Sequence, residues 1–267
     1  MKLGVIGGGV MGEALLSRLI DRQIYSPEEV LVSDPVAQRR DFLQQKYHIQ
    51  VSGDNQDAIA ASEVLLLAVK PQLLDAVVAG LAGGIGDAES KPLVISILAG
   101  VPLKRLEAAF PSLPVIRAMP NTPATVGASM SAIAPGQGVE EKHIALAKSI
   151  FQAVGEVLEV PEYLMDAVTG LSGSGPAYVA IAIEALADGG VAAGLPRTIA
   201  SQLAIQTVIG TAQLVKESGV HPAQLKDRVT SPGGTTIAGV AALEKAGFRN
   251  ALIEAVVAAY RRSQELA

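Results

Sequence analysis

Cysteine is absent from the 267 residues, and this absence removes several kinds of chemistry at once. The chain can form no disulfide framework, offers no thiolate nucleophile and cannot bind zinc through sulfur. Its three histidines, His48, His143 and His221, are too scattered along the sequence to suggest a metal cluster. We therefore expect no metal ion in the functional site.

Long basic runs and long apolar runs are missing as well. No run of Lys or Arg exceeds two residues and the formal net charge is −5, which argues against nucleic acid or an anionic membrane as a partner. The most apolar run, residues 64–69, is too short to span a bilayer. The segment MKLGVIGGG enters a strand at once, without the apolar region and cleavage site of a signal peptide, so we expect a cytoplasmic protein.

Residues 1–160 alternate short apolar runs with segments of helical spacing. Apolar residues make up 49% of the chain and charged residues 18%, which is typical of a globular protein. Continuous apolar strands separated by helices indicate a sheet that is covered on both faces. We therefore predict an α/β dinucleotide-binding domain with a doubly wound parallel sheet of the Rossmann type. The expected strands are Leu3–Ile6, Val30–Val32, Val64–Val69, Leu93–Ile97 and Val115–Arg117, and the first helix is expected over Val10–Arg22.

Residues 161–267 are predicted to form a separate, all-α domain. Prolines at the starts and glycines at the ends mark candidate helices at Pro176–Ala193, Pro196–Ser218, Thr236–Lys245 and Phe248–Leu266. The helix from Pro176 has almost no polar face, so it must be covered on most sides. We expect this domain to bury surface against a second subunit; the alternative is a self-sufficient bundle in a monomer.

The strongest single motif is G-x-G-x-x-G at residues 7–12, between the first strand and the first helix. In this position Gly7 permits a tight turn, Gly9 lets a pyrophosphate approach the backbone, and Gly12 allows the helix to pack closely on the strand. The free N–H groups of the helix start face the anion. An ordinary flexible loop is the alternative interpretation, and the strand-to-helix position argues against it.

The choice between NADH and NADPH stays open on sequence alone. Asp34 follows the second strand and lies about 20 residues beyond Gly12, where an acid grips the adenosine ribose and repels a 2′-phosphate. Arg39 and Arg40 lie roughly one turn into the next helix and are suited to bind that phosphate instead. A solvated helix face is the alternative reading of this arginine pair.

Two further strand ends are expected at the cofactor, because ligands bind outside the carboxyl ends of parallel strands. They are Ala68-Val69-Lys70-Pro71 and Ala99-Gly100. Lys70 is the charged side chain at this crevice and is expected near the nicotinamide ribose or a phosphate. Alternatively, it simply caps the edge of the sheet in solvent.

Seven stretches together resemble those of pyrroline-5-carboxylate reductases, in the order found in that family. They are GGGVMG, AVKPQ, SILAGV, IRAMPNTPA, GLSGSGPAY, ALADGGVAAGLP and LKDRVTSPGGTTI, and the match covers essentially the whole chain. The segment HPAQLKDRVTSPGGTTI, residues 221–237, is the most diagnostic one. The resemblance implies NAD(P)H-dependent reduction of L-1-pyrroline-5-carboxylate to L-proline, by an intertwined dimer that often assembles further.

The resemblance also assigns cofactor contacts by position. Asn55 belongs to this set only through the resemblance, on the adenosine side, since its sequence context alone reads as a turn. Relatives often carry a hydroxyl residue where this chain has Asp34, which weakens an automatic assignment of NADPH. The implied contacts are Gly7, Gly8, Gly9, Val10, Met11, Gly12, Asp34, Asn55, Ala68, Val69, Lys70, Pro71, Ala99 and Gly100.

The implied reaction transfers a hydride to C5 of a cyclic imine, which demands position and charge complementarity more than a strong acid. The segment Ser231-Pro232-Gly233-Gly234-Thr235-Thr236 opens a helix and forms an anion-binding N-terminus. We expect Ser231, Gly233, Gly234 and Thr235 to hold the substrate carboxylate. The family position of Thr236 implies that its hydroxyl faces the ring nitrogen. Ordinary helix capping is the alternative for this segment.

Two more glycine- and proline-rich segments resemble the lining of the family's active site. Asn121 and Thr122, in Met119–Pro123, are expected to orient nicotinamide or substrate; a plain proline-rich turn is the alternative. The segment Gly173–Pro176 either closes the pocket or lets two helices cross closely, and we favour the structural reading.

Rival functions make different demands on the sequence. A β-hydroxyacid dehydrogenase needs a lysine base one turn after its second glycine motif, where this chain has Val179. A coenzyme F420-dependent reductase shares the N-terminal layout but does not predict the TSPGGTT segment. A regulatory protein that senses nicotinamide without turnover has no reason to keep a carboxylate-sized pocket in the second domain.

Overall fold

The computed structural model describes residues 2–60, 63–81 and 91–266. The predicted domains 1–160 and 161–267 therefore each include residues outside the described part. The chain divides into two compact units. The sheet unit comprises Met1–Ser174 and Ala258–Ala267, and the helical unit comprises Gly175–Val257. The predicted domain boundary between residues 160 and 161 stays a prediction. None of the described helices is both long enough and apolar enough to cross a membrane.

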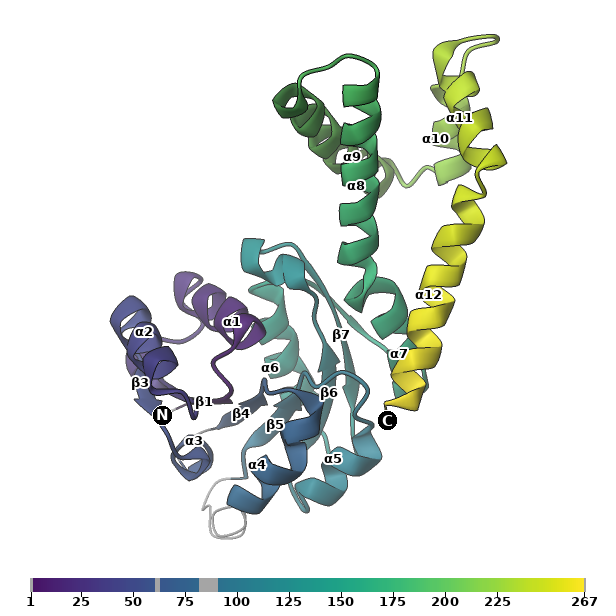
Figure 1. Cartoon of the computed structure of the whole chain (residues 1–267). Helices are drawn as coiled ribbons and strands as arrows, with labels where there is room; N and C mark the ends of the chain where they lie inside the picture. Colours follow the sequence, from purple (N-terminus) through teal and green to yellow (C-terminus); the bar gives the residue numbers. More distant parts are fainter. Residues whose placement is uncertain (1, 61–62, 82–90, 267) are drawn as a thin grey trace. The chain divides into compact units, whose positions relative to one another are not determined.

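Within the described ranges, one eight-stranded sheet forms the centre of the sheet unit (Figure 1). Its order is β3-β2-β1-β4-β5-β6-β7-β8. Because β1 pairs in parallel with both β2 and β4, the strand order reverses beside β1, which is where open α/β sheets bind ligands. The strands are β1 (Leu3–Ile6), β2 (Val30–Ser33), β3 (Gln50–Ser52), β4 (Val64–Leu67), β5 (Leu93–Ser96), β6 (Val115–Met119), β7 (Ser129–Pro135) and β8 (Gly155–Glu159).

The five predicted strands and the doubly wound arrangement are confirmed, but the sheet is not parallel throughout. Strand β7 runs antiparallel to β6, and β8 runs parallel to β7. The physical reason is the short connection between Met119 and Ser129, because a parallel crossover needs about a dozen residues or more. The alternating serines of β7 and the glutamates of β8 also hide both strands from a search for continuous apolar runs.

Apolar side chains project from both faces of the sheet, as the continuous apolar runs in the sequence predicted. In β4, Val64 and Leu66 belong to one buried cluster, and Leu65 and Leu67 belong to the other. The first cluster is covered by residues of α1, α2 and α6, and the second by residues of α3, α4 and α5. Because helices cover both faces of the sheet, the carboxyl ends of its parallel strands are the part available to bind a ligand. The helices are α1 (Val10–Asp21), α2 (Ala37–Tyr47), α3 (Asn55–Ala60), α4 (Leu74–Gly80), α5 (Leu103–Ala109), α6 (Glu141–Gln152) and α7 (Met165–Val168).

The remaining helices confirm the expected all-α region. They are α8 (Gly175–Ala192), α9 (Arg197–Ser218), α10 (Pro222–Arg228), α11 (Thr235–Lys245) and α12 (Phe248–Glu265). Three glycines with positive φ, Gly194, Gly219 and Gly247, follow the ends of α8, α9 and α11, as the sequence predicted. The short helix α10 was not predicted, because it is only seven residues long.

The helical unit buries little of its own apolar surface. Helices α8 and α9 pack together through a small cluster of Ala187, Ala200 and Ala204, with Ile183 against it. Large apolar side chains of the same helices stay exposed in the single chain, which is unusual for a monomeric protein. Among them are Ile181, Leu186, Ile199, Leu203, Ile205, Ile209 and Leu214.

Candidate active site

The glycine-rich turn joins β1 to α1, and its three motif glycines are required for different reasons. Gly7 has φ +102°, and a Cβ there would lie 2.7 Å from the carbonyl oxygen of Ala68. A Cβ on Gly12 would overlap the carbonyl oxygen of Gly7. Gly9 differs, because no described atom lies within 4 Å of its added Cβ. The fold itself therefore requires Gly7 and Gly12, whereas the empty space over Gly9 suits an approaching ligand.

Asp34 lies directly after β2 and is fixed against the glycine-rich turn. Its Oδ2 accepts a hydrogen bond from the N–H of Gly8 at 2.9 Å, and its Oδ1 accepts one from the N–H of Val36, also at 2.9 Å. The residue is only 9% exposed. Beside it, the Ser33 hydroxyl donates to Oδ1 of Asn55 at 2.7 Å, so the first residue of α3 is tied to the end of β2.

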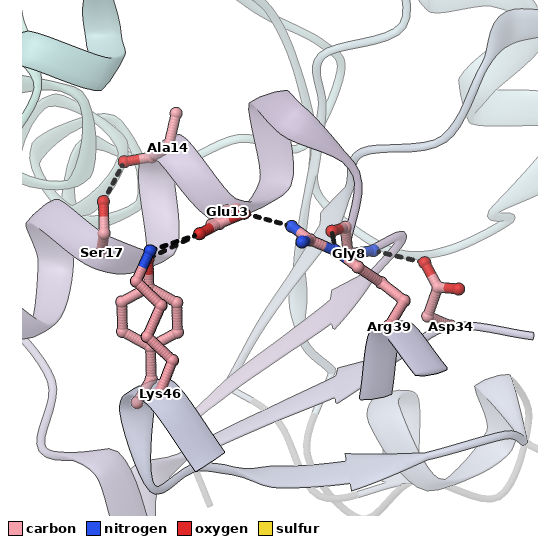
Figure 2. Close-up of polar contacts among 8 residues, drawn as sticks. Gly8, Glu13, Ala14, Ser17, Asp34, Arg39 and Lys46 are labelled. Carbon is pink, nitrogen blue, oxygen red and sulfur yellow. Dashed lines mark hydrogen bonds and ion pairs between the residues drawn. The ribbon is translucent and has the colours of Figure 1, made fainter. Parts of the chain in front are cut away.

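Arg39 lies in the first turn of α2 and reaches back to the same turn. Its Nε donates to the carbonyl oxygen of Gly8, and its Nη2 forms an ion pair with Glu13 of α1. Figure 2 shows Gly8 between Asp34 on one side and Arg39 on the other, with Glu13 beyond the arginine. Arg40 contacts the loop backbone instead, because its Nη1 donates to the carbonyl oxygens of Asp34 and Pro35.

Glu13 is the centre of a small polar cluster between α1 and α2. Its Oε1 accepts hydrogen bonds from Lys46 Nζ at 3.0 Å and from the Tyr47 hydroxyl at 2.8 Å, in addition to the pair with Arg39. Partial burial raises the pKa of Glu13, but the hydrogen bonds from Arg39, Lys46 and Tyr47 outweigh it and lower the pKa to about 2. The carboxylate is therefore charged throughout the neutral range.

The predicted segments after β4 and β5 lie at the same carboxyl edge of the sheet. Ala68 donates its N–H to the carbonyl oxygen of Ile6 at 2.8 Å, which brings the end of β4 against the glycine-rich turn. Lys70 follows and is exposed to solvent. Gly100 has φ +75°, and a Cβ there would lie 3.1 Å from Cβ of Leu266, so the residue directly after α12 packs on this turn.

Asn121 and Thr122 follow β6 and differ in their surroundings. The side chain of Asn121 is buried; its Nδ2 donates to the carbonyl oxygen of Ser172, and its Oδ1 accepts from the N–H of Met130. Asn121 thus joins the end of β6 to β7 and to the segment before α8. Thr122 is exposed at the start of the 3-10 turn Thr122–Val126.

The segment before α8 contains a local helical irregularity that the sequence did not predict. Thr169–Gly173 forms a π-helical turn, in which the N–H of Ser174 donates to the carbonyl oxygen of Thr169. A Cβ on Gly173 would contact the methyl group of Met119 at 2.5 Å. Because this methyl group is the end of a flexible side chain that can move aside, the approach does not by itself require glycine at this position. Single π turns occur often at functional sites, so the position beside β6 fits a site lining.

The predicted substrate segment, Ser231–Thr236, belongs to the helical unit and opens α11. Gly233 has φ +66°, and the N-cap residue is Gly234, which brings no capping side chain. Thr235 and Thr236 occupy the first turn and are exposed. The N-cap therefore brings no side-chain acceptor to the first N–H groups of α11, which leaves them available to an anion.

A buried arginine was also missed by the sequence analysis. Arg117 of β6 is only 4% exposed; its guanidinium pairs with Glu162 at 3.4 Å and with Asp166 at 3.2 Å. Ser263 of α12 donates its hydroxyl to the same Oδ1 of Asp166 at 2.8 Å. The network holds the end of α12 on the sheet unit. The sequence offered one weak signal, a charged residue at the end of an apolar strand.

The described residues hold no group of three or more His, Asp or Glu side chains placed to bind a metal ion. The cradle that they do form has a glycine-rich turn with open space over Gly9, an acid fixed against that turn and two further strand ends at one edge. These features fit a nicotinamide dinucleotide.

Comparisons with known proteins agree on one family. A model described as pyrroline-5-carboxylate reductase dimerisation matches residues 162–266, and a model described as NADP oxidoreductase coenzyme F420-dependent matches residues 2–100. A pyrroline-5-carboxylate reductase from Synechocystis is 67% identical over 266 residues, 100% of this chain and 98% of the relative.

Solved structures give the same result. A pyrroline-5-carboxylate reductase from Coxiella burnetii matches with a TM-score of 0.90 and 35% identity, over 100% of this chain and 98% of that one. The enzyme from Plasmodium falciparum, crystallised with NADP bound, matches with a TM-score of 0.90 and 31% identity over the same shares.

Proposed function

Because the chain belongs to the pyrroline-5-carboxylate reductase family, we infer from that membership which of its residues bind cofactor and substrate. The protein is an NAD(P)H-dependent imine reductase that converts L-1-pyrroline-5-carboxylate to L-proline, the last step of proline biosynthesis. When bound, the reduced nicotinamide supplies the hydride. The chain itself must hold the dinucleotide, hold the substrate acid and exclude wrong orientations.

The dinucleotide is proposed to lie over the glycine-rich turn. The observation that carries this proposal is the contrast among the three glycines, since Gly9 alone faces empty space. The N–H groups at the start of α1 receive the pyrophosphate, and Asp34 receives the adenosine ribose beside Asn55. The other proposed cofactor contacts are Gly7, Gly8, Val10, Met11, Gly12, Ala68, Val69, Lys70, Pro71, Ala99 and Gly100.

The substrate carboxylate is proposed to bind at the start of α11. Ser231, Gly233, Gly234 and Thr235 form the anion site, which the uncapped N–H groups of this helix support. Thr236 then presents its hydroxyl to the ring nitrogen, where charge changes during reduction. Asn121 and Thr122 of the sheet unit are proposed to orient the nicotinamide or the substrate. Asn121 acts through its fixed orientation rather than through a free amide.

The protein associates with itself through the helical unit. The matched family model is a dimerisation model, and it spans this region. The exposed apolar side chains of α8 and α9 support the same conclusion, because a second subunit is needed to cover them. The cytoplasm stays our prediction for the location, which fractionation of the source cells tests.

Substitution of Thr236 tests the proposed substrate site. Thr236→Ala is expected to lower kcat/KM by roughly tenfold to a thousandfold, because a donor to the reacting group is lost. The matched variant Thr236→Ser keeps the hydroxyl and is expected to retain most of the activity. Turnover is followed through the absorbance of the reduced nicotinamide, and cofactor binding through its fluorescence. Unchanged turnover of Thr236→Ala with normal cofactor binding would show that this role is wrong.

A further inference from the structure

The backbone of Gly8 holds an acidic and a basic side chain at one point of the predicted cofactor site. Its N–H donates to Asp34, and its carbonyl oxygen accepts from Arg39 (Figure 2). Both side chains are thereby fixed beside the position of the adenosine ribose, where NADH carries a 2′-hydroxyl and NADPH a 2′-phosphate. Their charges therefore decide which reductant fits.

At that position Arg39 is already engaged by other partners. Its guanidinium pairs with Glu13 and lies over the ring of Phe42, 5.0 Å from the ring centre. The side chain is 25% exposed, so most of its surface is already covered. The Nε and Nη2 atoms of Arg39 are already used by Gly8 and Glu13, so a phosphate must compete with Glu13 for the guanidinium charge. Lys46, the neighbouring cation, is bound to the same carboxylate.

The acid has no such partner. Among the described residues, no lysine or arginine pairs with the carboxylate of Asp34, which accepts hydrogen bonds from two backbone N–H groups instead. Arg40 is close, but its Nη1 donates to the carbonyl oxygens of Asp34 and Pro35 rather than to the carboxylate. Within the described residues, the carboxylate of Asp34 is therefore hydrogen-bonded but paired with no cation.

We propose that Glu13 determines cofactor specificity: by holding Arg39, it leaves Asp34 unopposed and makes the enzyme prefer NADH to NADPH. Glu13 is a positioning residue, because it acts through Arg39 and contacts no part of the cofactor. The inference rests on the proposed dinucleotide site. It assigns the choice between NADH and NADPH in part to a residue of α1, which is distant in sequence from the β2–α2 loop that usually determines this choice.

The test compares kcat/KM for the two reductants in the wild-type enzyme and in Glu13→Gln. The wild type is expected to favour NADH by about tenfold or more, because a carboxylate accepts the 2′-hydroxyl and repels the phosphate. In Glu13→Gln the freed Arg39 is expected to lower KM for NADPH by about tenfold, with kcat and KM for NADH nearly unchanged. A general loss of structure would instead raise KM for both reductants.

Two further variants control the interpretation. Glu159→Gln removes another glutamate that pairs with a lysine, Lys148 at 2.8 Å, on the edge strand β8, and is expected to leave the preference unchanged. Arg39→Gln added to Glu13→Gln is expected to abolish the gain for NADPH. A wild type that prefers NADPH, or a preference that Glu13→Gln does not move, overturns the proposal.

Binding measurements keep the test decisive if a variant does not fold or if turnover fails. On the wild type, AMP is expected to displace fluorescent NADH at lower concentration than adenosine 2′,5′-bisphosphate does. The reverse order overturns the inference. Absence of turnover with either reductant, with dinucleotide binding intact, counts against the proposed function and leaves the ranking of the two competitors as the test of selectivity.

Discussion

The substitution Gly9→Ala tests whether glycine at this position is required for the stability of the fold or for the binding of the ligand. Gly9 is the N-cap of α1, with φ −66° and ψ −172°, which alanine also adopts. No described atom lies within 4 Å of the added methyl group. Reduced freedom of the unfolded chain stabilises such a substitution by about 0.4–1 kcal/mol, while alanine is a poorer N-cap than glycine by a similar amount. The free energy of unfolding is therefore expected to change by less than about 1 kcal/mol.

The same methyl group occupies the space proposed for the pyrophosphate. A ligand that must stand off by the radius of a methyl group loses hydrogen bonds to the N–H groups of α1. We expect the Kd for NADH to rise by about 10–100-fold, which corresponds to about 1.4–2.7 kcal/mol. Urea unfolding gives the stability, and titration of nicotinamide fluorescence gives the affinity.

Gly12→Ala is the matched comparison on the same turn. Its methyl group would lie closer to the carbonyl oxygen of Gly7 than the 3.0 Å that Cβ atoms respect, so α1 and the turn must move apart. Overpacking of this kind costs about 1–3 kcal/mol. Gly12→Ala is thus expected to lose stability, whereas Gly9→Ala loses only affinity. Equal affinity for NADH in Gly9→Ala and the wild type, or a destabilised Gly9→Ala, would refute the assignment of the open space to the ligand.

Two other predictions concern stability. Arg117→Met leaves Glu162 and Asp166 without their shared cation and is expected to lower the free energy of unfolding by about 2–3 kcal/mol in urea titrations; a change below about 0.5 kcal/mol would show that the network contributes nothing. Glu13 has a folded pKa of about 2 against an ordinary value of 4.5, so the unfolded chain binds its proton first as the pH falls. Above pH 5, Glu13 is expected to contribute about 2–3 kcal/mol to the free energy of unfolding, and this contribution is lost as the pH falls from the ordinary pKa of 4.5 to the folded pKa of about 2. The free energy of unfolding of Glu13→Gln is therefore expected to depend less on pH. Parallel curves for the two proteins would contradict this.

Much of the fold was predictable because local chemistry determines it. The continuous apolar runs of β1, β4 and β5 require two covered faces. The glycines after α8, α9 and α11 adopt the positive φ that commonly ends a helix. The direction of β7 was predictable in principle from the short connection after Met119, yet its alternating serines concealed the strand itself.

The candidate site was predictable only in part, because some of its contacts depend on packing. The sequence indicated Asp34 and left the arginines open. It could not show that Arg39 pairs with Glu13, since that contact arises when α2 packs beside α1. Likewise, Asn121 was expected to orient nicotinamide or substrate, which stays a prediction. The hydrogen bonds that fix its amide, to Ser172 and Met130, could not be read from the sequence because they depend on packing.

The central claim is that this chain directs a hydride from a nicotinamide on the glycine-rich turn to the imine carbon of a bound pyrroline carboxylate. Reduced nicotinamide that carries deuterium at the transferable position tests it most directly. The account predicts that every proline formed carries one deuterium at C5. Gly9→Ala is expected to form this labelled proline more slowly at subsaturating reductant, because it binds the cofactor more weakly. Proline without deuterium, or no proline at all with saturating reductant and substrate, would contradict the account.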